Sequence, residues 1–505
     1  MAETLEQSKS QTFVLEAIDI SKKYGGVQAL DNVSLRLKAG EVHSLAGENG
    51  CGKSTLIKII SGVEKMDAGT IVVNGVSHNH MTPRQAIQLG IQVIFQDFSL
   101  FPNLTVLENI MLTDNIAQKK KFFSKAKIRP VAEKIIHDLG LDLDLDSYVE
   151  ELTVAEKQLT AICRALVNDA RVIFMDEPTT ALTHTEVERL FELVERLRGQ
   201  GVSIVFVSHK LDEALGISQE VTVLRSGKLV IDGPASDFDY HSLSTYMTGK
   251  DISNTRKLNP VDEQAAPILE VEKLSRDETF EDINFALYPG EVLGITGLLG
   301  SGRSEIAESL FGVSPAHSGT ITVNGVQHKI KNIDAAIRAG IGYVPEDRLT
   351  QGLFLDQPIA DNIIAGSLGA HKVAGLFLND KKIKRTINQL FRKLRIKAPN
   401  VDAPVRSLSG GNAQRVVLAK WLANKPKVLI LNGPTVGVDV GSKEEILTIL
   451  RELASQKVGV IIVSDDAPEL VAVCNRVLIV KQGRLFTTLA GDEVNVNAIQ
   501  EGMAV

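Results

Sequence analysis

The chain has little of what marks secreted, membrane-spanning or metal-clustered proteins. Its 505 residues include three cysteines, one tryptophan and only 5% aromatic residues. The cysteines have no metal-like spacing and supply no disulfide framework, which is typical of a reducing compartment. No apolar run approaches the roughly 18 residues that a membrane-spanning helix needs, and Met1 to Gln11 lacks the apolar core of a signal peptide. The chain itself is therefore expected to stay on one side of a membrane.

Basic residues are outnumbered as well. The chain has 55 lysines and arginines against 62 aspartates and glutamates, a formal net charge of −7. Because nucleic-acid phosphates select basic surfaces, this balance argues against a nucleic-acid partner. Hydrophobic residues at 44% and charged residues at 23% are ordinary for a globular chain, which at this length has room for two to four domains.

The same motifs occur twice along the chain. Gly47 and Gly297 open two glycine-rich loops at an offset of 250 residues, and Asp176 and Asn432 end two apolar runs at an offset of 256. An offset that changes by only six residues over this distance indicates one fold duplicated. We therefore predict a first domain over residues 1–245, a linker over 246–265 and a second domain over 266–505.

Each copy shows the same coarse pattern of secondary structure. Val42–Ala46 and Val292–Thr296 are expected to be buried strands that run into the glycine loops, and Lys53–Ser61 is expected to be a helix. The sequence turns helical between about 97 and 165 and again between about 347 and 420. The predicted fold class is therefore α/β, with two tandem domains that each carry an inserted helical subdomain.

The first glycine loop matches the phosphate-binding pattern G-x-x-x-x-G-K-[ST]. In this pattern backbone N–H groups surround phosphate oxygens, Lys53 reaches the β- and γ-phosphates, and the Ser54 hydroxyl ligates Mg²⁺. The nucleotide-binding residues predicted in this loop are Gly47, Glu48, Asn49, Gly50, Cys51, Gly52, Lys53, Ser54 and Thr55.

An acidic pair, Asp176-Glu177, follows four apolar residues. Asp176 is predicted to hold Mg²⁺ through water, and Glu177 to polarise the water that attacks the γ-phosphate. Alone, such a pair is commonplace at a solvated strand end. Together with Lys53 it predicts a site that hydrolyses a nucleotide.

The second glycine loop is chemically altered. Arg303 replaces the lysine, and Asn432-Gly433 replaces the acidic pair, so that neither a base nor a charged Mg²⁺ ligand stands there. Arg303 can still fork to phosphate oxygens, which predicts nucleotide binding without hydrolysis. The binding residues predicted in this loop are Gly297, Gly300, Ser301, Gly302, Arg303 and Ser304.

These residues resemble an ATP-binding cassette (ABC) ATPase over nearly the whole chain, which implies two P-loop NTPase domains. Leu408-Ser-Gly-Gly-Asn412 is similar to the signature of that family, whereas the first half has Leu152-Thr-Val-Ala-Glu156. The resemblance implies that the two cassettes pair head to tail around ATP and Mg²⁺, each site using the signature of the other half. The signature residues implied are Ser409, Gly410, Gly411 and Asn412.

The resemblance also assigns roles to single residues. Tyr24 would stack on adenine and Asp439 would be the D-loop aspartate. Gln96 would ligate Mg²⁺ and act in catalysis with Glu177 and His209. Taken alone, Tyr24 is as readily a surface aromatic, Gln96 a solvated polar residue, and His209 a hydrogen-bonded histidine at a strand end.

The implied pairing leaves one complete site and one broken site. Every expected group is present at the site of the first glycine loop, and the losses of both halves converge on the other. The groups of the broken site are Arg303, Glu346, Asn432, Gly433, Asp465, Thr153, Val154, Ala155 and Thr183. The second half has also lost four residues around the turn that would contact adenine.

Three segments of the second half resemble the ATPases of bacterial simple-sugar importers of the ribose, xylose and galactose type. They are Gly297–Glu305, Tyr343–Arg348 and Gly437–Gly441, and Asn432-Gly433 departs from that pattern. The resemblance implies two integral membrane permease subunits that contact the grooves near Gln96 and Glu346, and a separate substrate-binding protein. It also implies a peripheral location on the cytoplasmic face of the inner membrane.

The cargo is not encoded in this chain. Uptake of a nucleoside or an autoinducer stays open, because those importers look similar at the ATPase. A ribosome-associated tandem ABC ATPase fits less well, since such proteins resemble each other in a long basic helical linker and two competent sites.

Overall fold

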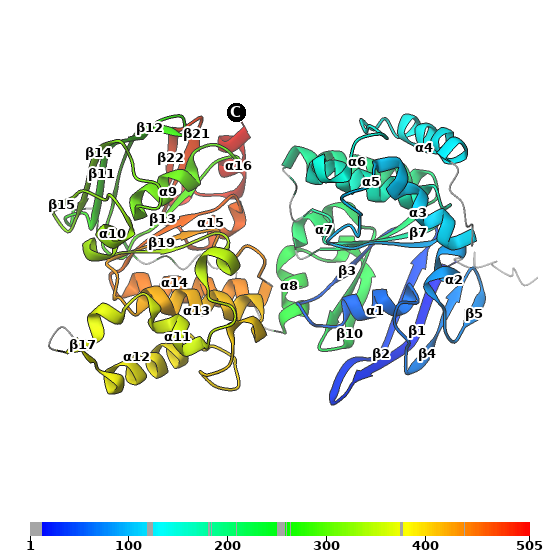
Figure 1. Ribbon diagram of the computed structural model, residues 1–505, viewed down its shortest axis with the longest axis horizontal. Coiled ribbons are helices and arrows are strands. Elements are labelled where there is room, and N and C mark those ends of the chain that lie inside the picture. Colours follow the sequence, from blue (N-terminus) through cyan, green and yellow to red (C-terminus); the bar gives the residue numbers. More distant parts are fainter. Residues whose placement is uncertain are drawn as a thin grey trace, which may run out of the picture. The chain divides into compact units, whose positions relative to one another are not determined.

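The structure is a computed structural model. The chain folds into two compact units, Met1–Ile252 and Ser253–Val505 (Figure 1). The residues described are 13–118, 125–179, 182, 184–208, 210–249, 258, 260–262, 264–373, 377–438 and 440–504. Each unit is an α/β domain with a helical subdomain, as the sequence predicts. The division falls inside the expected linker 246–265, while the domain bounds themselves stay a prediction.

In the first unit a mainly parallel sheet positions the first glycine loop. Its strand order is β10-β9-β3-β8-β7-β6, and β9 and β10 pair antiparallel. The strands are β3 (Val42–Ala46), β6 (Ile91–Ile94), β7 (Val172–Asp176), β8 (Ser203–Val207), β9 (Glu220–Arg225) and β10 (Lys228–Pro234). Since β3, β8 and β7 are parallel neighbours, their carboxyl ends meet at one edge of the sheet, where loops can form a ligand site.

A second, antiparallel sheet of the first unit has the order β2-β1-β4-β5. Its strands are β1 (Phe13–Tyr24), β2 (Val27–Lys38), β4 (Ala68–Val73) and β5 (Val76–His78). The β1–β2 hairpin turns at Gly25-Gly26, where Tyr24 pairs with Val27. The hairpin thus carries Tyr24 at its tip.

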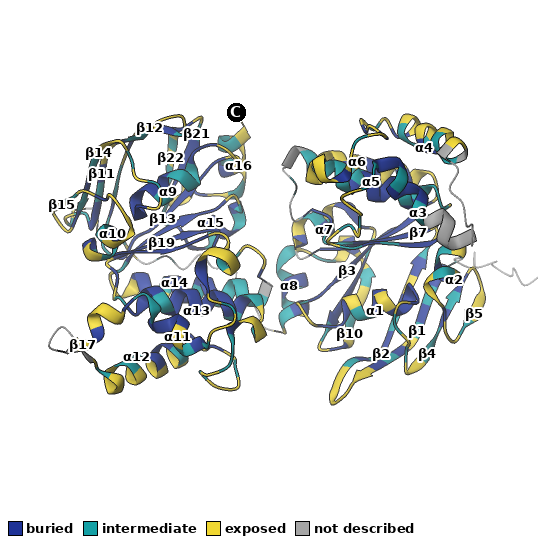
Figure 2. Cartoon of the chain, viewed as in Figure 1, coloured by how far each residue is buried: buried dark blue, intermediate teal, exposed yellow. Residues whose placement is uncertain are grey.

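Helices cover the parallel sheet and build the subdomain (Figure 1). They are α1 (Lys53–Ile60), α2 (Pro83–Gln88), α3 (Val106–Gln118), α4 (Lys125–Asp138), α5 (Val154–Leu166), α6 (His184–Gly199), α7 (Leu211–Ile217) and α8 (Tyr240–Thr248). The subdomain has its own apolar cluster, in which Leu107 and Ile110 of α3 pack with Cys163 of α5. Figure 2 shows the parallel strands buried and α4 largely exposed.

The second unit repeats this plan. Its parallel sheet has the order β16-β19-β20-β13-β21-β22 and its antiparallel sheet the order β12-β11-β14-β15. The strands are β11 (Leu269–Arg276), β12 (Phe280–Leu287), β13 (Val292–Thr296), β14 (Ser318–Val323), β15 (Val326–His328), β16 (Ile341–Val344), β19 (Val428–Asn432), β20 (Gly459–Val463), β21 (Arg476–Lys481) and β22 (Arg484–Ala490). Strands β11 and β12 have 8 residues each against 12 in β1 and β2, so the hairpin tip that carries Tyr24 has no counterpart.

The helices of the second unit are α9 (Arg303–Phe311), α10 (Ile333–Ala339), α11 (Ile359–Ala365), α12 (Asp380–Lys393), α13 (Gly410–Leu422), α14 (Val440–Ser455), α15 (Ala467–Val473) and α16 (Val496–Ala504). A short hairpin, β17 (Lys372–Val373) with β18 (Phe377–Leu378), interrupts the subdomain that the sequence predicts as helical. In the core, the Phe311 ring stacks on Tyr343 with centroids 5.1 Å apart and meets Trp421 edge to face at 5.0 Å.

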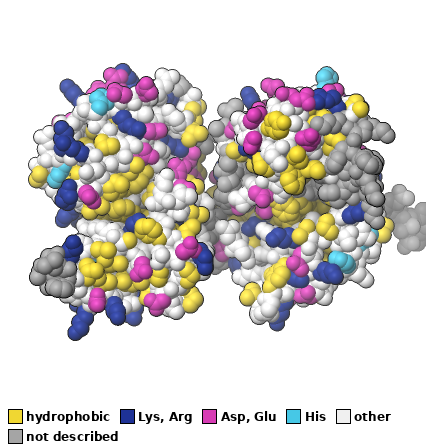
Figure 3. Space-filling view, in the orientation of Figure 1, with side chains coloured by type: hydrophobic (Ala, Val, Ile, Leu, Met, Phe, Trp, Pro, Cys, Tyr) yellow, Lys and Arg dark blue, Asp and Glu magenta, His cyan; other side chains and the backbone are white. Residues whose placement is uncertain are grey.

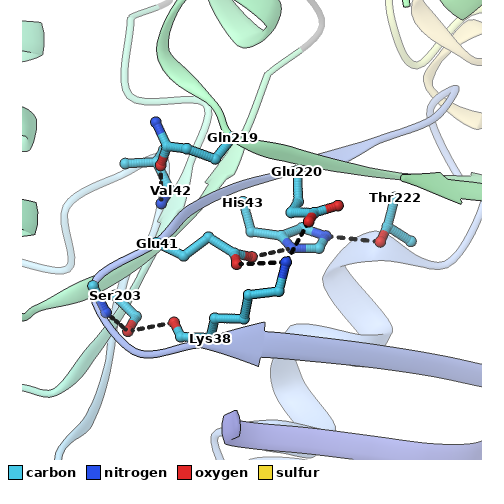
Figure 4. A network of polar contacts seen from close by, with 9 residues as sticks. Lys38, Glu41, Val42, His43, Ser203, Gln219, Glu220 and Thr222 are labelled. Atoms are coloured by element: carbon cyan, nitrogen blue, oxygen red, sulfur yellow. Dashed lines mark hydrogen bonds and ion pairs between the residues drawn. The ribbon is translucent and has the colours of Figure 1, made fainter. Parts of the chain in front are cut away.

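A polar network anchors the amino-terminal part of β3, opposite the glycine loop (Figure 4). The buried His43 ring contacts Glu41 Oε1 through Nδ1 at 2.9 Å and Thr222 Oγ1 through Nε2 at 2.7 Å. Lys38 forms an ion pair with Glu220 and lies 3.7 Å from Glu41. Because buried polar groups are costly without partners, these contacts fix the register of β3 against β9.

The surface mixes both signs of charge. In the face drawn in Figure 3, lysines and arginines are interspersed with aspartates and glutamates on both units. Among the described residues, no helix combines the length and the apolar character that crossing a membrane requires.

Candidate functional site

The first glycine loop connects β3 to α1 and is shaped by glycines in the left-handed region. Gly52, the N-cap of α1, has φ 115°, and a Cβ there would lie 2.7 Å from the carbonyl oxygen of Ala29. Only glycine fits this approach. The predicted residues Gly47, Glu48, Asn49, Gly50, Cys51 and Gly52 form the loop, and Lys53, Ser54 and Thr55 form the first turn of α1. Helix N–H groups therefore face the loop, as phosphate binding requires.

Lys53 is folded onto the loop that it serves. Its buried Nζ donates to the carbonyl oxygens of Gly47 at 2.5 Å and Glu48 at 3.0 Å. Cys51 Sγ lies 3.8 Å from the same Nζ, and burial raises the pKa of that thiol against the opposing charge of Lys53. The ammonium thus stands at the centre of the loop with its charge held by neutral oxygens that a phosphate can replace.

Three of the predicted residues line one cleft of about 600 Å³. They are Ser54 at the start of α1, Asp176 at the end of β7 and Gln96 two residues after β6. The other lining residues are Ile57, Lys58, Phe95, Asp97 and Ser99. The structure therefore brings together the hydroxyl, carboxylate and amide that the sequence assigns to one metal ion.

Asp176 is half-buried in this cleft. Burial is the main cause that raises the pKa of its carboxyl, and the neighbouring Glu177 raises it further. Lys53 and Lys58 oppose the shift. A cation placed against Asp176 would relieve both the desolvation and the like-charge repulsion.

Glu177 stands at the first position after β7 in a left-handed backbone conformation. Its φ is 51°, and its N–H donates to the carbonyl oxygen of Val207 at 2.8 Å. A non-glycine residue at positive φ costs about 1–2 kcal/mol. This conformation fixes the direction in which the Glu177 side chain leaves the strand end beside Asp176.

Tyr24 lies at the tip of the β1–β2 hairpin with 43% of its surface exposed. Lys22 Nζ lies 5.2 Å from the centroid of its ring. Tyr24 is outside the lining of the cleft formed by Ser54, Gln96 and Asp176. Its ring is therefore available at the surface, as a stacking role requires.

The segment after Gln96 is held by a residue that sequence reasoning missed. Phe98 and Ser99 have φ of 58° and 47°, and Arg164 of α5 donates to their carbonyl oxygens at 2.9 and 2.7 Å. Burial lowers the pKa of Arg164. No local pattern in the sequence marks Arg164, because its partners lie some 65 residues away.

The signature residues of the second half begin helix α13. Ser409 is its exposed N-cap and makes no capping bond from its side chain, while Asn412 Nδ2 donates to Ser409 Oγ at 2.9 Å. Gly410 and Gly411 follow in the first turn. The corresponding Thr153 of α5 instead accepts a bond from Glu156 N in a capping box. The start of α13 thus offers first-turn N–H groups that α5 uses internally.

Arg348 joins two loops of the second half, a contact that sequence reasoning also missed. It lies in a single π-turn, η3 (Arg348–Gly352), and its guanidinium donates to the carbonyl oxygens of Val436 and Gly437, the latter at 2.9 Å. A Cβ on Gly410 would lie 2.8 Å from Arg348 Nη2. The arginine therefore holds the turn before position 439 against the start of α13.

The second glycine loop keeps the shape of the first but not its chemistry. Gly297, Gly300, Ser301 and Gly302 connect β13 to α9, which begins with Arg303 and Ser304. Arg303 Nη1 donates to the carbonyl oxygen of Gly297 at 2.6 Å, and Nη2 lies 3.1 Å from Asp465 Oδ2. Ser304 Oγ lies 3.4 Å from Asn432 Oδ1. The position of the acidic pair is thus occupied by neutral groups.

Three residues assigned from the sequence lie outside the described residues. They are His209, Asp439 and Thr183. Their roles stay predictions.

Comparison with known proteins agrees with the duplicated plan. Residues 30–180 and 280–436 match the family model described as ABC transporter. The chain is 39% identical to "Ribose import ATP-binding protein RbsA 2" of Burkholderia ambifaria over 96% of both chains. It is 38% identical to "Ribose import ATP-binding protein RbsA" of Bacillus licheniformis over 96% of this chain and 97% of that one. A solved nucleotide-free ATP-binding cassette from an ABC transporter aligns at 29% identity with a TM-score of 0.41, over 44% of this chain and 91% of that chain.

Proposed function

The chain belongs to the ABC transporter family, and we propose that it is the ATP-hydrolysing subunit of an importer for a simple sugar. The observation that carries the proposal is the first glycine loop, where Lys53 stands at the loop centre and Ser54, Gln96 and Asp176 line one cleft. Relatives named as ribose import ATP-binding proteins match 96% of the chain. This match favours a sugar, and within that class ribose, over a nucleoside or an autoinducer.

The same cleft suits ATP with Mg²⁺. Mg²⁺ prefers oxygen ligands, and Ser54, Asp176 and Gln96 supply a hydroxyl, a carboxylate and an amide oxygen. When bound, the ion neutralises charge that develops on the transferred phosphoryl group. Tyr24, at the hairpin tip, stacks on the adenine.

The protein residues then divide the reaction between them. Lys53 exchanges the carbonyl oxygens of Gly47 and Glu48 for the β- and γ-phosphates, which are stronger, charged partners. Glu177 accepts a proton from the attacking water, and its fixed backbone keeps the carboxylate at the strand end. His209 contacts the γ-phosphate.

Only the first glycine loop supports hydrolysis in this proposal. The two halves pair head to tail, and Ser409–Asn412 with Asp439 complete the ATP site of Lys53. The exposed Ser409 and the first-turn N–H groups of α13 favour this assignment, since Thr153 and Glu156 cap the corresponding turn of α5 internally. The other site would combine Arg303 with the capped α5, and it binds nucleotide without hydrolysing it.

The chain works with other subunits in this proposal. Two membrane permease subunits bind the grooves near Gln96 and Glu346, and a substrate-binding protein delivers the sugar. The chain is then held at the cytoplasmic face of the membrane.

The experiment uses the complex of this chain with its membrane subunits and binding protein, in vesicles. Glu177→Gln is expected to reduce ATP hydrolysis 10²- to 10⁴-fold, the usual contribution of a general base, while ATP binding is kept. Glu192→Gln, an exposed glutamate of α6, serves as the matched control. A Glu177→Gln complex that keeps half of the rate would contradict the proposal.

The cargo is tested in the same complex with the unaltered chain. Hydrolysis is measured with ribose, xylose, galactose, a nucleoside and an autoinducer. Stimulation by a sugar, ribose foremost, is expected. Stimulation by the nucleoside or the autoinducer alone would replace the sugar with that cargo and leave the ATPase assignment in place.

A further inference from the structure

The second glycine loop contains a counter-ion supplied by its own domain. Arg303 Nη2 lies 3.1 Å from Asp465 Oδ2, which follows the end of β20 by two residues. The arginine side chain is 11% exposed and the aspartate 69%. We propose that this loop is a nucleoside-diphosphate site. Asp465 pairs with the part of the Arg303 guanidinium that a third phosphate would otherwise contact. The nucleotide class rests on the proposed function.

The phosphate cradle itself is present. Gly300 and Gly302 have φ of 79° and 97°, close to those of a phosphate loop. Helix α9, which has nine residues, begins directly after Gly302. Ser301 Oγ is buried, points towards Gly297 and has no hydrogen-bond partner among the described residues. Arg303 donates to Gly297 O at 2.6 Å, as Lys53 donates to Gly47 O at 2.5 Å. A cation therefore stands beside a loop of the shape that phosphate binding requires.

The charge around this loop limits the ligand. Asp465 already neutralises Arg303, so each added phosphate charge meets a carboxylate as well as a guanidinium. Glu308 and Glu346 act on the Tyr343 hydroxyl and, with burial as the main cause, raise its pKa to about 12. In the first half Lys58 and Gln96 hold the positions of those two glutamates. The second loop thus disfavours the extra charge that distinguishes a triphosphate from a diphosphate.

The second glycine loop also differs from the first in the groups that would hold Mg²⁺. Ser304, which corresponds to Ser54, is directed to Asn432 Oδ1 at 3.4 Å, and Asn432 Nδ2 lies 3.5 Å from Tyr343 Oη. A neutral amide replaces the aspartate that would hold Mg²⁺ in the first half. The diphosphate is therefore expected to bind without Mg²⁺.

The test measures nucleotide binding in the full chain with the first loop disabled by Lys53→Ala. With EDTA present, ADP and a non-hydrolysable ATP analogue are titrated by calorimetry. ADP is expected to bind about tenfold more tightly than the analogue, a difference of about 1.4 kcal/mol. Asp465→Asn should reduce the ratio of the two affinities to about twofold. The analogue should bind more tightly to this variant, because one repulsive charge is removed.

Two controls locate the effect. Asp356→Asn removes a carboxylate that pairs with Arg406 at 2.7 Å in the same unit and should leave the ratio unchanged. Arg303→Ala, added to Lys53→Ala, should abolish ADP binding and so place it at the second loop. The proposal would be overturned if ADP did not bind, or if the ATP analogue bound as tightly as ADP or more tightly. It would also be overturned if ADP binding survived Arg303→Ala, or if Asp465→Asn left the ratio of the two affinities unchanged. ATP hydrolysis by the unaltered chain, measured in parallel, reports separately on the proposed function.

Discussion

Glu177 and Gly433 have the same backbone conformation at the same place in the two halves. Their φ angles are 51° and 58°, and each N–H donates at 2.8 Å to the last residue of the neighbouring strand, Val207 or Val463. Glycine adopts this conformation without strain, whereas glutamate does not. The first half therefore keeps a strained residue where the second half has relaxed, which is expected if only the first needs the carboxylate.

The strain at Glu177 predicts a difference between two substitutions that both remove the carboxylate. Glu177→Gly should leave the first domain more stable than Glu177→Ala by about 1 kcal/mol, because only glycine suits positive φ. Thermal unfolding without nucleotide measures this difference. At Glu192, inside α6, the order should reverse, since alanine is the better helix former. Equal stability of the two Glu177 variants would show that the backbone there is not strained.

Arg348 is expected to act as a positioning residue. Its bonds to Val436 and Gly437 hold the turn before position 439 beside Gly410. Arg348→Ala should lower the kcat of ATP hydrolysis by the assembled transporter about tenfold or more and leave the KM for ATP little changed. The reason is that a small displacement of the turn before position 439 would misplace the groups that this turn positions. Arg348→Lys should recover part of the rate.

The matched control for Arg348 is Arg406→Ala, which removes an exposed arginine of the same unit. It should behave like the unaltered chain. A KM that rises together with the fall in kcat, or equal effects of Arg348→Ala and Arg406→Ala, would count against the positioning role.

Glu469 predicts a pH dependence of stability in the second domain. Burial raises the pKa of its carboxyl to about 7, Asp466 adds to the shift and Lys443 opposes it. At pH values between the ordinary glutamate pKa and about 7, Glu469 is protonated in the folded state and ionised in the unfolded state. The contribution to the free energy of unfolding is thus full at low pH and lost as pH rises, by at most about 1.4 kcal/mol per pH unit.

The measurement compares the unaltered chain with Glu469→Gln from pH 5 to pH 8. The amide cannot ionise, so the difference in unfolding temperature should shift in favour of the variant up to about pH 7 and then level off. Groups that both chains share cancel in the difference. A difference that is constant over this range would refute the raised pKa.

The strongest local patterns of the sequence predict the structure well. Val42–Ala46 and Val292–Thr296 are strands at those bounds, because short apolar runs before a glycine loop have few alternatives. The predicted helix at Lys53 ends at Ile60, with Ser61 as its C-cap. The hairpin β17–β18 escapes prediction, because two-residue strands leave no periodicity to detect.

Contacts between distant segments are beyond a single sequence. Arg164 and Arg348 act on carbonyl oxygens 65 to 89 residues away. No local pattern marks Arg164, and the motif that contains Arg348 does not reveal which residues it contacts. Arg303 and Asp465 both stand out as altered residues, but their ion pair depends on β13 and β20 being neighbours in the sheet. The sequence therefore predicts which residues share a site, whereas the individual hydrogen bonds and ion pairs within that site come from the structure.

If the second half's signature completes the ATP site of Lys53, a matched pair of substitutions in the two halves should affect ATP hydrolysis unequally. Ser409 and Thr153 are the exposed N-caps of α13 and α5, and aspartate is favourable at an N-cap, so neither substitution should unfold the start of its helix. If the halves pair head to tail as proposed, Ser409→Asp places a negative charge against the γ-phosphate of the ATP held by Lys53, whereas Thr153→Asp faces the site without a base. ATP hydrolysis by the assembled transporter should fall at least about 10²-fold with Ser409→Asp and stay within about twofold with Thr153→Asp. Equal losses of hydrolysis in two folded, assembled variants would contradict the proposed head-to-tail pairing.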